Sequence, residues 1–313
     1  MSEIDLRLSN VDPPDPEPKR TIYRDIVNLP DPAKFGLTIR YFNYDDVGLY
    51  FQITGSATGY TFGTVNLGLL ASGANAYINL DEFASRAKPS TGDLPNGEKE
   101  ENITLILKAY TDSGYTNLKW TYERVVTVHW INSADATFTV DELDDFDDGL
   151  YHDWDIEKIT IGGYSLDTVT KNIMTDYVLS PPYSLRGDGY SNWNGTPQTT
   201  YAQQLIIRKD TDELIHLGLG APVAGASTDI PINKWMRLVV PLPTNTTFTI
   251  KVYVAGNWKN ANYSRVFAFQ LFKSITTPNK TNVFAIIDVR VYSGGTSNGY
   301  IYVWLDDFKI LSK

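Results

Sequence analysis

The sequence predicts an all-β protein that is built from two domains and a short extended arm. Three observations support this: the residue composition, the chain length and the alternation of apolar residues. Aromatic residues make up 13% of the 313 residues, with 20 Tyr and 7 Trp, and aromatic and β-branched residues favour half-buried pleated surfaces. Short apolar runs separated by polar turns recur along the chain, whereas no long stretch repeats with the helical period.

The length indicates two domains, because 313 residues are too many for one ordinary sandwich. We expect an arm over residues 1–33, a first domain over 34–132 and a second over 133–313. The arm contains VDPPDPEPKR, and Pro fixes φ and lacks a backbone donor, so an extended conformation is expected. We hypothesise that the arm docks on a neighbouring subunit as an added strand. Its expected anchors are Leu6, Leu8, Ile22, Tyr23, Ile26 and Val27.

Residues 34–132 contain several short strand-like segments. Residues 122–131 alternate, with Val126, Val128 and Trp130 on one face and Val125 and other residues on the opposite face. Such strands at short intervals, joined by polar turns, are typical of a β-sandwich. In architecture this segment resembles immunoglobulin-like or fibronectin-like domains, although the chain has no Cys and therefore no Cys pair.

Residues 133–313 end in a strand-like segment over 300–311 with two candidate apolar faces. One face carries Ile301, Val303 and Leu305, and the other carries Tyr300, Tyr302 and Trp304. A strand whose two faces are both covered lies at the centre of a sheet.

Four segments of this second half occur in the order found in jelly-roll carbohydrate-binding modules. They are DFDDG at 145–149, PYSLR at 182–186, KWMR at 234–237 and YVWLDDF at 302–308. The second half therefore resembles such modules, which implies a β-jelly roll. The resemblance also implies a structural calcium ion that joins the first strand to the last. The implied ligands come from Asp147 or Asp148 and from Asp306 or Asp307, and the alternative for the acidic run is a solvated linker.

Five aromatic residues of the second half stand in polar, Gly- and Asn-rich surroundings. Aromatic rings stack on the C–H faces of sugars, and neighbouring amides bind hydroxyls. Tyr and Trp are also common in protein interfaces and in cores, so both alternatives remain open for this set. The residues are Tyr190, Trp193, Tyr201, Trp258 and Tyr263.

Charge and composition exclude several classes of function. The net charge of −10 and the pI of about 4.8 disfavour nucleic-acid binding. With no Cys and three His, thiolate and His-rich metal sites are not expected. The first ten residues contain no apolar leader-like region, and we expect no membrane insertion.

We expect no enzyme, because no nucleophile elbow, phosphate loop or recognisable pair of catalytic carboxylates occurs. Tandem sandwich and jelly-roll domains resemble turret, spike and fibre proteins of viruses. The resemblance implies a structural or decorating protein on the outer surface of a virion or similar assembly, which contacts other subunits as a homo-oligomer and binds host glycans. The alternative is an extracellular glycan-binding module, free or associated with a glycoside hydrolase. A jelly-roll lyase or hydrolase is the third hypothesis.

Overall fold

The protein is all-β, as the sequence predicts. The described residues form strands and three short 3₁₀ helices, η1 (Leu80–Glu82), η2 (Thr91–Asp93) and η3 (Pro95–Gly97), without an α-helix. The chain divides into two compact units, the first running mainly over Met1–Asp135 and the second over Ala136–Val223 and Thr228–Lys313. The computed structural model describes residues 2–8, 20–27, 29–35, 37–179, 181–192, 202–209, 212–220, 235–259, 264–294 and 299–313.

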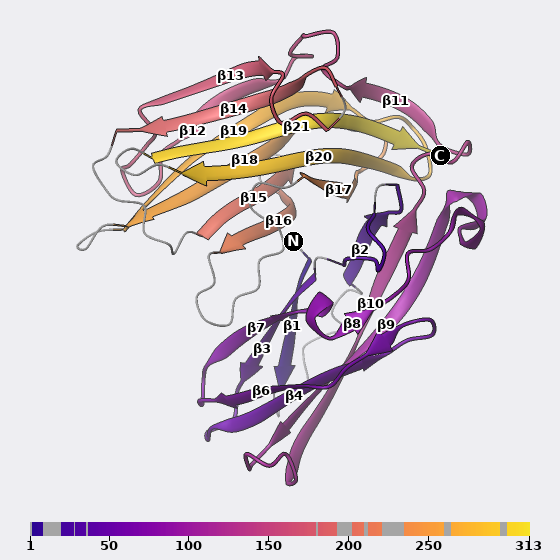
Figure 1. Ribbon diagram of the computed structural model, residues 1–313, viewed down its shortest axis with the longest axis vertical. Helices are drawn as coiled ribbons and strands as arrows, with labels where there is room; N and C mark the ends of the chain where they lie inside the picture. Colours follow the sequence, from indigo (N-terminus) through magenta and orange to yellow (C-terminus); the bar gives the residue numbers. More distant parts are fainter. Residues whose placement is uncertain are drawn as a thin grey trace. The chain divides into compact units, whose positions relative to one another are not determined.

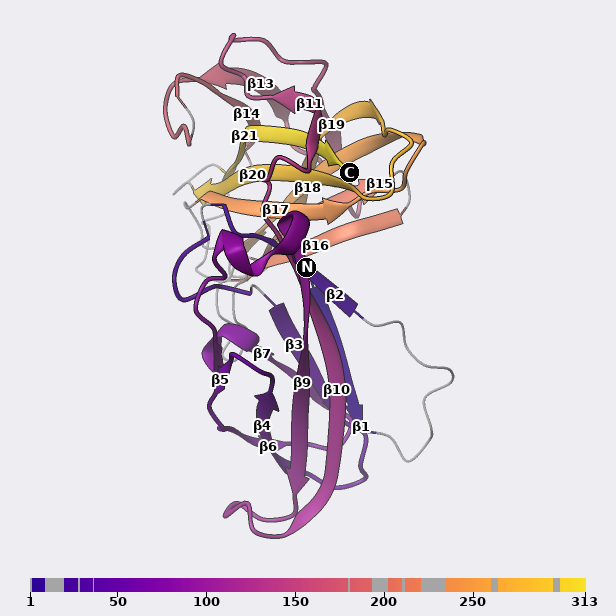
Figure 2. The ribbon, with the colours of Figure 1, turned by 90° about the vertical axis from the view of Figure 1, so that its right-hand side faces the viewer.

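Unit 1 is a sandwich of a five-stranded and a three-stranded sheet (Figure 1). The long strands β9 (Glu98–Tyr110) and β10 (Leu118–Ile131) pair antiparallel along the length of unit 1 (Figure 2). A small additional sheet pairs β5 (Thr61–Phe62) with β8 (Ala84–Ser85). The five-stranded sheet has the order β2 (Arg20–Asp25), β10 (Leu118–Ile131), β9 (Glu98–Tyr110), β4 (Leu49–Ser56) and β6 (Val65–Leu70), and the three-stranded sheet has the order β1 (Ser2–Leu8), β3 (Leu37–Asn43) and β7 (Asn75–Asn79).

The alternation expected for residues 122–131 is confirmed in β10. Val126, Val128 and Trp130 are fully buried in the core of unit 1, whereas Val125 on the opposite face is 42% exposed. The pleat turns successive side chains to opposite faces, and only Val126, Val128 and Trp130 belong to this core, although Thr127 and Ile131 on the other face are also buried.

The expected free arm needs a correction, because its described parts belong to unit 1. Strand β1, with Leu6 and Leu8, pairs in parallel with β3, and β2 pairs in parallel with β10. Ile22 and Ile26 are 1% and 3% exposed in the core of unit 1. Ile22 and Ile26 are thus buried within the same chain, and each of the two strands pairs along one edge with a strand of unit 1.

The two remaining expected anchors, Tyr23 and Val27, also contact residues of unit 1. The Tyr23 ring stacks on His129 with a centroid distance of 5.1 Å, and Val27 is half-buried and donates its N–H to Asp25. Residues 20–27 therefore pack against unit 1 of their own chain, and the expectation that they dock on another subunit stays a prediction. The Pro-rich segment at residues 9–19 lies outside the described residues.

Unit 2 contains two antiparallel sheets, the layered arrangement of a jelly roll (Figure 1). Every strand pair in this unit is antiparallel. The second sheet has the order β12 (Asp155–Ile159), β19 (Ser264–Thr276), β18 (Thr247–Lys259), β15 (Ala202–Lys209) and β16 (Asp212–Gly220). The first sheet has the order β13 (Thr168–Met174), β14 (Ser184–Ser191), β21 (Gly299–Ser312), β20 (Val283–Gly294) and β17 (Trp235–Pro241), with β11 (Thr139–Asp144) also paired to β21.

Strand β21 lies at the centre of the first sheet, between β14 and β20. Ile301, Val303 and Leu305 are fully buried and form its inner face. Tyr300, Tyr302 and Trp304 alternate with them and therefore share the outer face. Both expected faces exist, and only the aliphatic one points into the core of unit 2. No helix among the described residues could cross a membrane.

Candidate functional site

The outer face of the first sheet of unit 2 carries an aromatic cluster built by three adjacent strands. The register places Tyr190 of β14 opposite Tyr300 of β21, and Tyr292 of β20 opposite Tyr302 of β21. Directly opposed residues in a sheet lie close enough for their side chains to interact. We call this set the aromatic face; it consists of Tyr190, Tyr292, Tyr300, Tyr302 and Trp304.

The rings of the aromatic face form a continuous row. Tyr302 stacks on Tyr292 and on Tyr300, with centroid distances of 5.9 Å in both pairs and interplanar angles of 16° and 15°. Tyr300 and Tyr190 have centroids 5.1 Å apart, and Trp304 lies 5.7 Å from Tyr302. Rings that pack on one another in this way hold fixed positions on the sheet, so the surface is formed before any ligand arrives.

The exposure of the row is graded. The four tyrosines are half-buried, whereas Trp304 is 3% exposed. None of the four tyrosine hydroxyls makes a hydrogen bond to the part of the chain that the structure describes. The indole N–H of Trp304 is likewise buried without a hydrogen-bond partner among the described residues.

Polar side chains border the rings on strands β13 and β14. Arg186 stands opposite Trp304 in the register, and its guanidinium carbon lies 5.2 Å from the Tyr302 centroid. Asp188 accepts hydrogen bonds of 2.9 Å from Arg186 and from the side-chain amide of Asn172. Burial raises the pKa of Asp188, an effect that the Arg186 guanidinium opposes. The group thus places a carboxylate, a guanidinium and an amide beside the aromatic rings.

Arg290 of β20 flanks Trp304 on the opposite side of β21 from Arg186. It stands opposite Trp304, with its guanidinium carbon 5.4 Å from the indole centroid and 3.6 Å from the Tyr177 centroid. Tyr177, which is 50% exposed, meets Trp304 edge-on at 5.4 Å. Burial lowers the pKa of Arg290. Two aromatic rings therefore hold a cation at the border of the face.

Of the five aromatic residues expected at a glycan or interface site, one belongs to the aromatic face. Tyr190 lies in the row, and Trp258 lies in β18 of the second sheet, where its side chain is not described. Trp193, Tyr201 and Tyr263 lie outside the described residues. Tyr300, Tyr302 and Trp304 were expected from the sequence only as one candidate apolar face of the last strand. Tyr292 was not singled out.

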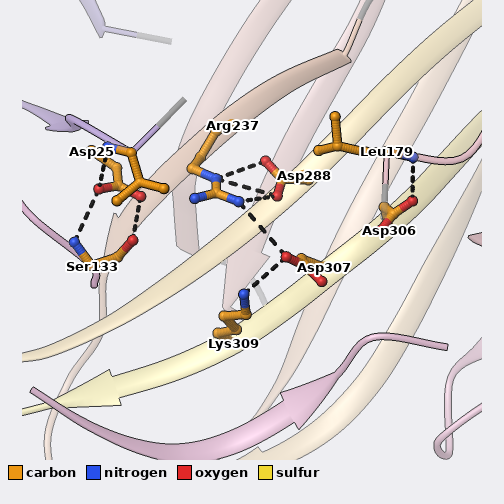
Figure 3. Close-up of polar contacts among 9 residues, drawn as sticks. Asp25, Ser133, Leu179, Arg237, Asp288, Asp306, Asp307 and Lys309 are labelled. Atoms are coloured by element: carbon orange, nitrogen blue, oxygen red, sulfur yellow. Dashed lines mark hydrogen bonds and ion pairs between the residues drawn. The ribbon is translucent and has the colours of Figure 1, made fainter. Parts of the chain in front are cut away.

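The two carboxylates expected from the last strand are already bound to protein groups (Figure 3). Asp306 is fully buried and accepts a 2.6 Å hydrogen bond from the backbone N–H of Leu179. Asp307 lies 2.9 Å from the ammonium of Lys309 and 3.7 Å from the guanidinium of Arg237. Arg237 also binds Asp288 at 2.5 Å. Cations of the protein therefore compensate the charge of Asp307, whereas a backbone N–H donates to Asp306.

The acidic turn after β11 contains the other two carboxylates that the resemblance assigns to calcium. Asp147 and Asp148 are both exposed. One oxygen of Asp148 accepts from the N–H of Leu150 at 2.9 Å and lies 3.0 Å from a ring nitrogen of His152. The described residues contain no group of three or more His, Asp or Glu side chains that could hold a metal ion. The calcium ion that the resemblance implies therefore stays a prediction.

Comparison with known proteins adds no family to these observations. No family model matches the chain, and no curated protein matches it significantly.

Proposed function

We propose that unit 2 binds carbohydrate and that the aromatic face is its binding surface. The observation that carries the proposal is the ordered row of four tyrosines and one tryptophan across β14, β21 and β20. Sugars combine C–H faces, which pack on aromatic rings, with hydroxyls, which need donors and acceptors at the border. Asp188 and Asn172 supply such groups next to the row.

The charge of the surface favours a neutral glycan. Arg186 lies within 2.5 Å of Asp188 and 3.8 Å of Asp176, so carboxylates balance its charge. Arg290 is packed against Tyr177 and Trp304. The whole chain carries a net charge of −10, which repels polyanions at long range. We therefore expect neutral oligosaccharides to bind in preference to acidic ones.

A glycan array followed by calorimetric titration with the best neutral oligosaccharide tests this function. We expect saturable binding by the full chain. Tyr300→Ala and Tyr302→Ala should each weaken it by roughly tenfold, the order of one lost ring contact. Tyr164→Ala is the matched control, because Tyr164 is 40% exposed and packs on Arg265 of β19 in the second sheet. Absence of binding to any glycan, or equal loss in the control, would contradict the proposal.

The virion hypothesis remains a second proposal without a structural observation of its own. Its main support in the sequence was an arm free to reach another subunit, and the described parts of that arm pair with unit 1. A decorating protein that attaches through surface glycans would use the same aromatic face. Size-exclusion chromatography with light scattering checks the expected homo-oligomer.

A further inference from the structure

A buried ion pair joins the two sheets of unit 2. Lys273 follows Phe269 and Leu271 at two-residue spacing on the inner face of β19, and Asp144 ends β11 in the other sheet. The Lys273 ammonium nitrogen lies 2.7 Å from Oδ2 of Asp144, and the two side chains are 7% and 4% exposed. The pair is therefore held at contact distance in a place that solvent barely reaches.

The surroundings of this pair are aromatic. Trp154 and Phe308 are fully buried, with ring centroids 5.3 Å apart, and the Lys273 nitrogen lies 5.8 Å from the Phe308 centroid. Burial of an ion pair costs desolvation energy that attraction alone often does not recover. Apolar residues of similar size would stabilise unit 2 as well as this salt bridge does, or better. A contribution to stability alone therefore does not explain the pair.

Each oxygen of the Asp144 carboxylate has a different partner. The indole N–H of Trp154 donates to Oδ2 at 2.8 Å, on the oxygen that also contacts Lys273. Oδ1 faces Nδ1 of His152 at 3.8 Å, and His152 is 24% exposed. Oδ2 is thus held by two donors, and Oδ1 faces the imidazole of His152.

We propose that Lys273 and Asp144 condense spontaneously to an isopeptide bond once unit 2 has folded. A proton leaves Nζ, and the nitrogen lone pair attacks Cγ of Asp144 to form the new C–N bond. Trp154 stabilises the negative charge that develops on Oδ2 in the tetrahedral intermediate. The bond from Cγ to Oδ1 then breaks, and Oδ1 departs as water with the two protons that the ammonium lost, one of them relayed by His152.

The reaction is balanced without an oxidant, a cofactor or a co-reactant. An ammonium and a carboxylate become one amide and one water molecule, and the net charge stays the same. Well-oriented intramolecular groups reach effective concentrations on the order of 10⁵–10⁸ M. Such proximity compensates for the reluctance of free amines and carboxylates to condense in water. The product would tie β11 covalently to β19, and so join the first strand of unit 2 to the opposite sheet.

Mass spectrometry of the full chain tests this bond. We expect the denatured wild-type protein to be lighter than its sequence by the mass of one water molecule, and Lys273→Arg to have its full sequence mass. Asp144→Asn should release ammonia in place of water and reach the same product. Tryptic digestion of the wild-type chain should yield one branched peptide that contains both Asp144 and Lys273.

Two outcomes would overturn the proposal. The first is a soluble wild-type chain with a native circular dichroism spectrum and its full sequence mass after prolonged incubation, a result that needs no variant. The second is a loss of water confined to the Asp148–Gly149 step without a branched peptide, which would indicate succinimide formation there. Glycan binding is measured separately, so failure of this bond leaves the proposed function unaffected.

Discussion

Gly189 and Phe269 meet across the two sheets of unit 2 without room for a side chain on the glycine. A Cβ atom added to Gly189 would lie 2.9 Å from Cδ1 of Phe269 and 2.7 Å from a methyl carbon of Leu166. Gly187, two residues earlier on the same inner face of β14, is equally close to the Phe269 ring. The glycines thus let the second sheet approach directly beneath Asp188 and Tyr190 of the candidate site.

We therefore expect Gly189→Ala to destabilise unit 2. Overpacking of a filled core costs roughly 1–3 kcal/mol, and the loss should appear as a lower free energy of unfolding in urea. Gly63→Ala is the control, because the nearest atom to its added Cβ is 3.8 Å away. Equal effects of the two substitutions would show that the close approach to Phe269 is not maintained in solution.

The stacking of Arg290 between Tyr177 and Trp304 predicts a measurable coupling. Arg290→Lys keeps a positive charge but loses the planar group that stacks on the rings. We expect a loss of about 0.5–2 kcal/mol in the free energy of unfolding. A double-mutant cycle with Tyr177→Ala isolates the pair, and a coupling energy near zero would rule out the stacked arrangement.

Glu101 makes the stability of unit 1 depend on pH. Burial raises its pKa, but hydrogen bonds from Arg86, Lys99, Trp130 and Tyr60 outweigh it and lower the pKa to about 2. The folded carboxyl group therefore releases its proton more easily than the unfolded one, whose ordinary pKa is 4.5. Its contribution is complete above pH 4.5 and is lost as the pH falls through about 2.

We expect Glu101→Gln to lower the free energy of unfolding of unit 1 at neutral pH by on the order of 2 kcal/mol, allowing for solvent screening. The difference from wild type should shrink in acid, because the wild-type carboxyl is then protonated as well. Glu123→Gln, at an exposed position of β10, should change the stability little at any pH. A constant difference across the acid range would contradict the lowered pKa.

The fold class followed from local patterns because alternation fixes which face of a strand is buried. In β10 that information was sufficient for most of the strand, since Val126, Val128 and Trp130 alternate with the exposed Val125 and with the polar Thr127 and His129. In β21 the same reasoning left two apolar faces, and only the opposite sheet decides between them. The inner face packs in the core, and the aromatic residues are left on the outside.

The candidate site was harder to foresee because it depends on register between distant strands. Tyr292 and Tyr302 become neighbours only through the pairing of β20 with β21. The acidic residues at 306 and 307 suggested a cation, but the sequence does not show that Arg237 of β17 comes next to Asp307. Strand β2 was assigned to the expected arm because it directly follows the Pro-rich stretch. Its own residues alternate as in a strand.

Strand β2 contributes a buried side chain to the core of unit 1. Ile22 is 1% exposed in the core of unit 1, although it belongs to the segment expected to be a free arm. Ile22→Ala should lower the free energy of unfolding by about 2–5 kcal/mol, the usual cost of emptying a buried aliphatic site. Val125→Ala is the control, because it removes an aliphatic side chain that is 42% exposed on the neighbouring strand β10.

Deletion of residues 1–27 should abolish the unfolding transition of unit 1, since it removes both parallel strands. A truncated chain whose unit 1 melts normally in calorimetry would restore the free arm, and with it the expectation that these residues serve another subunit.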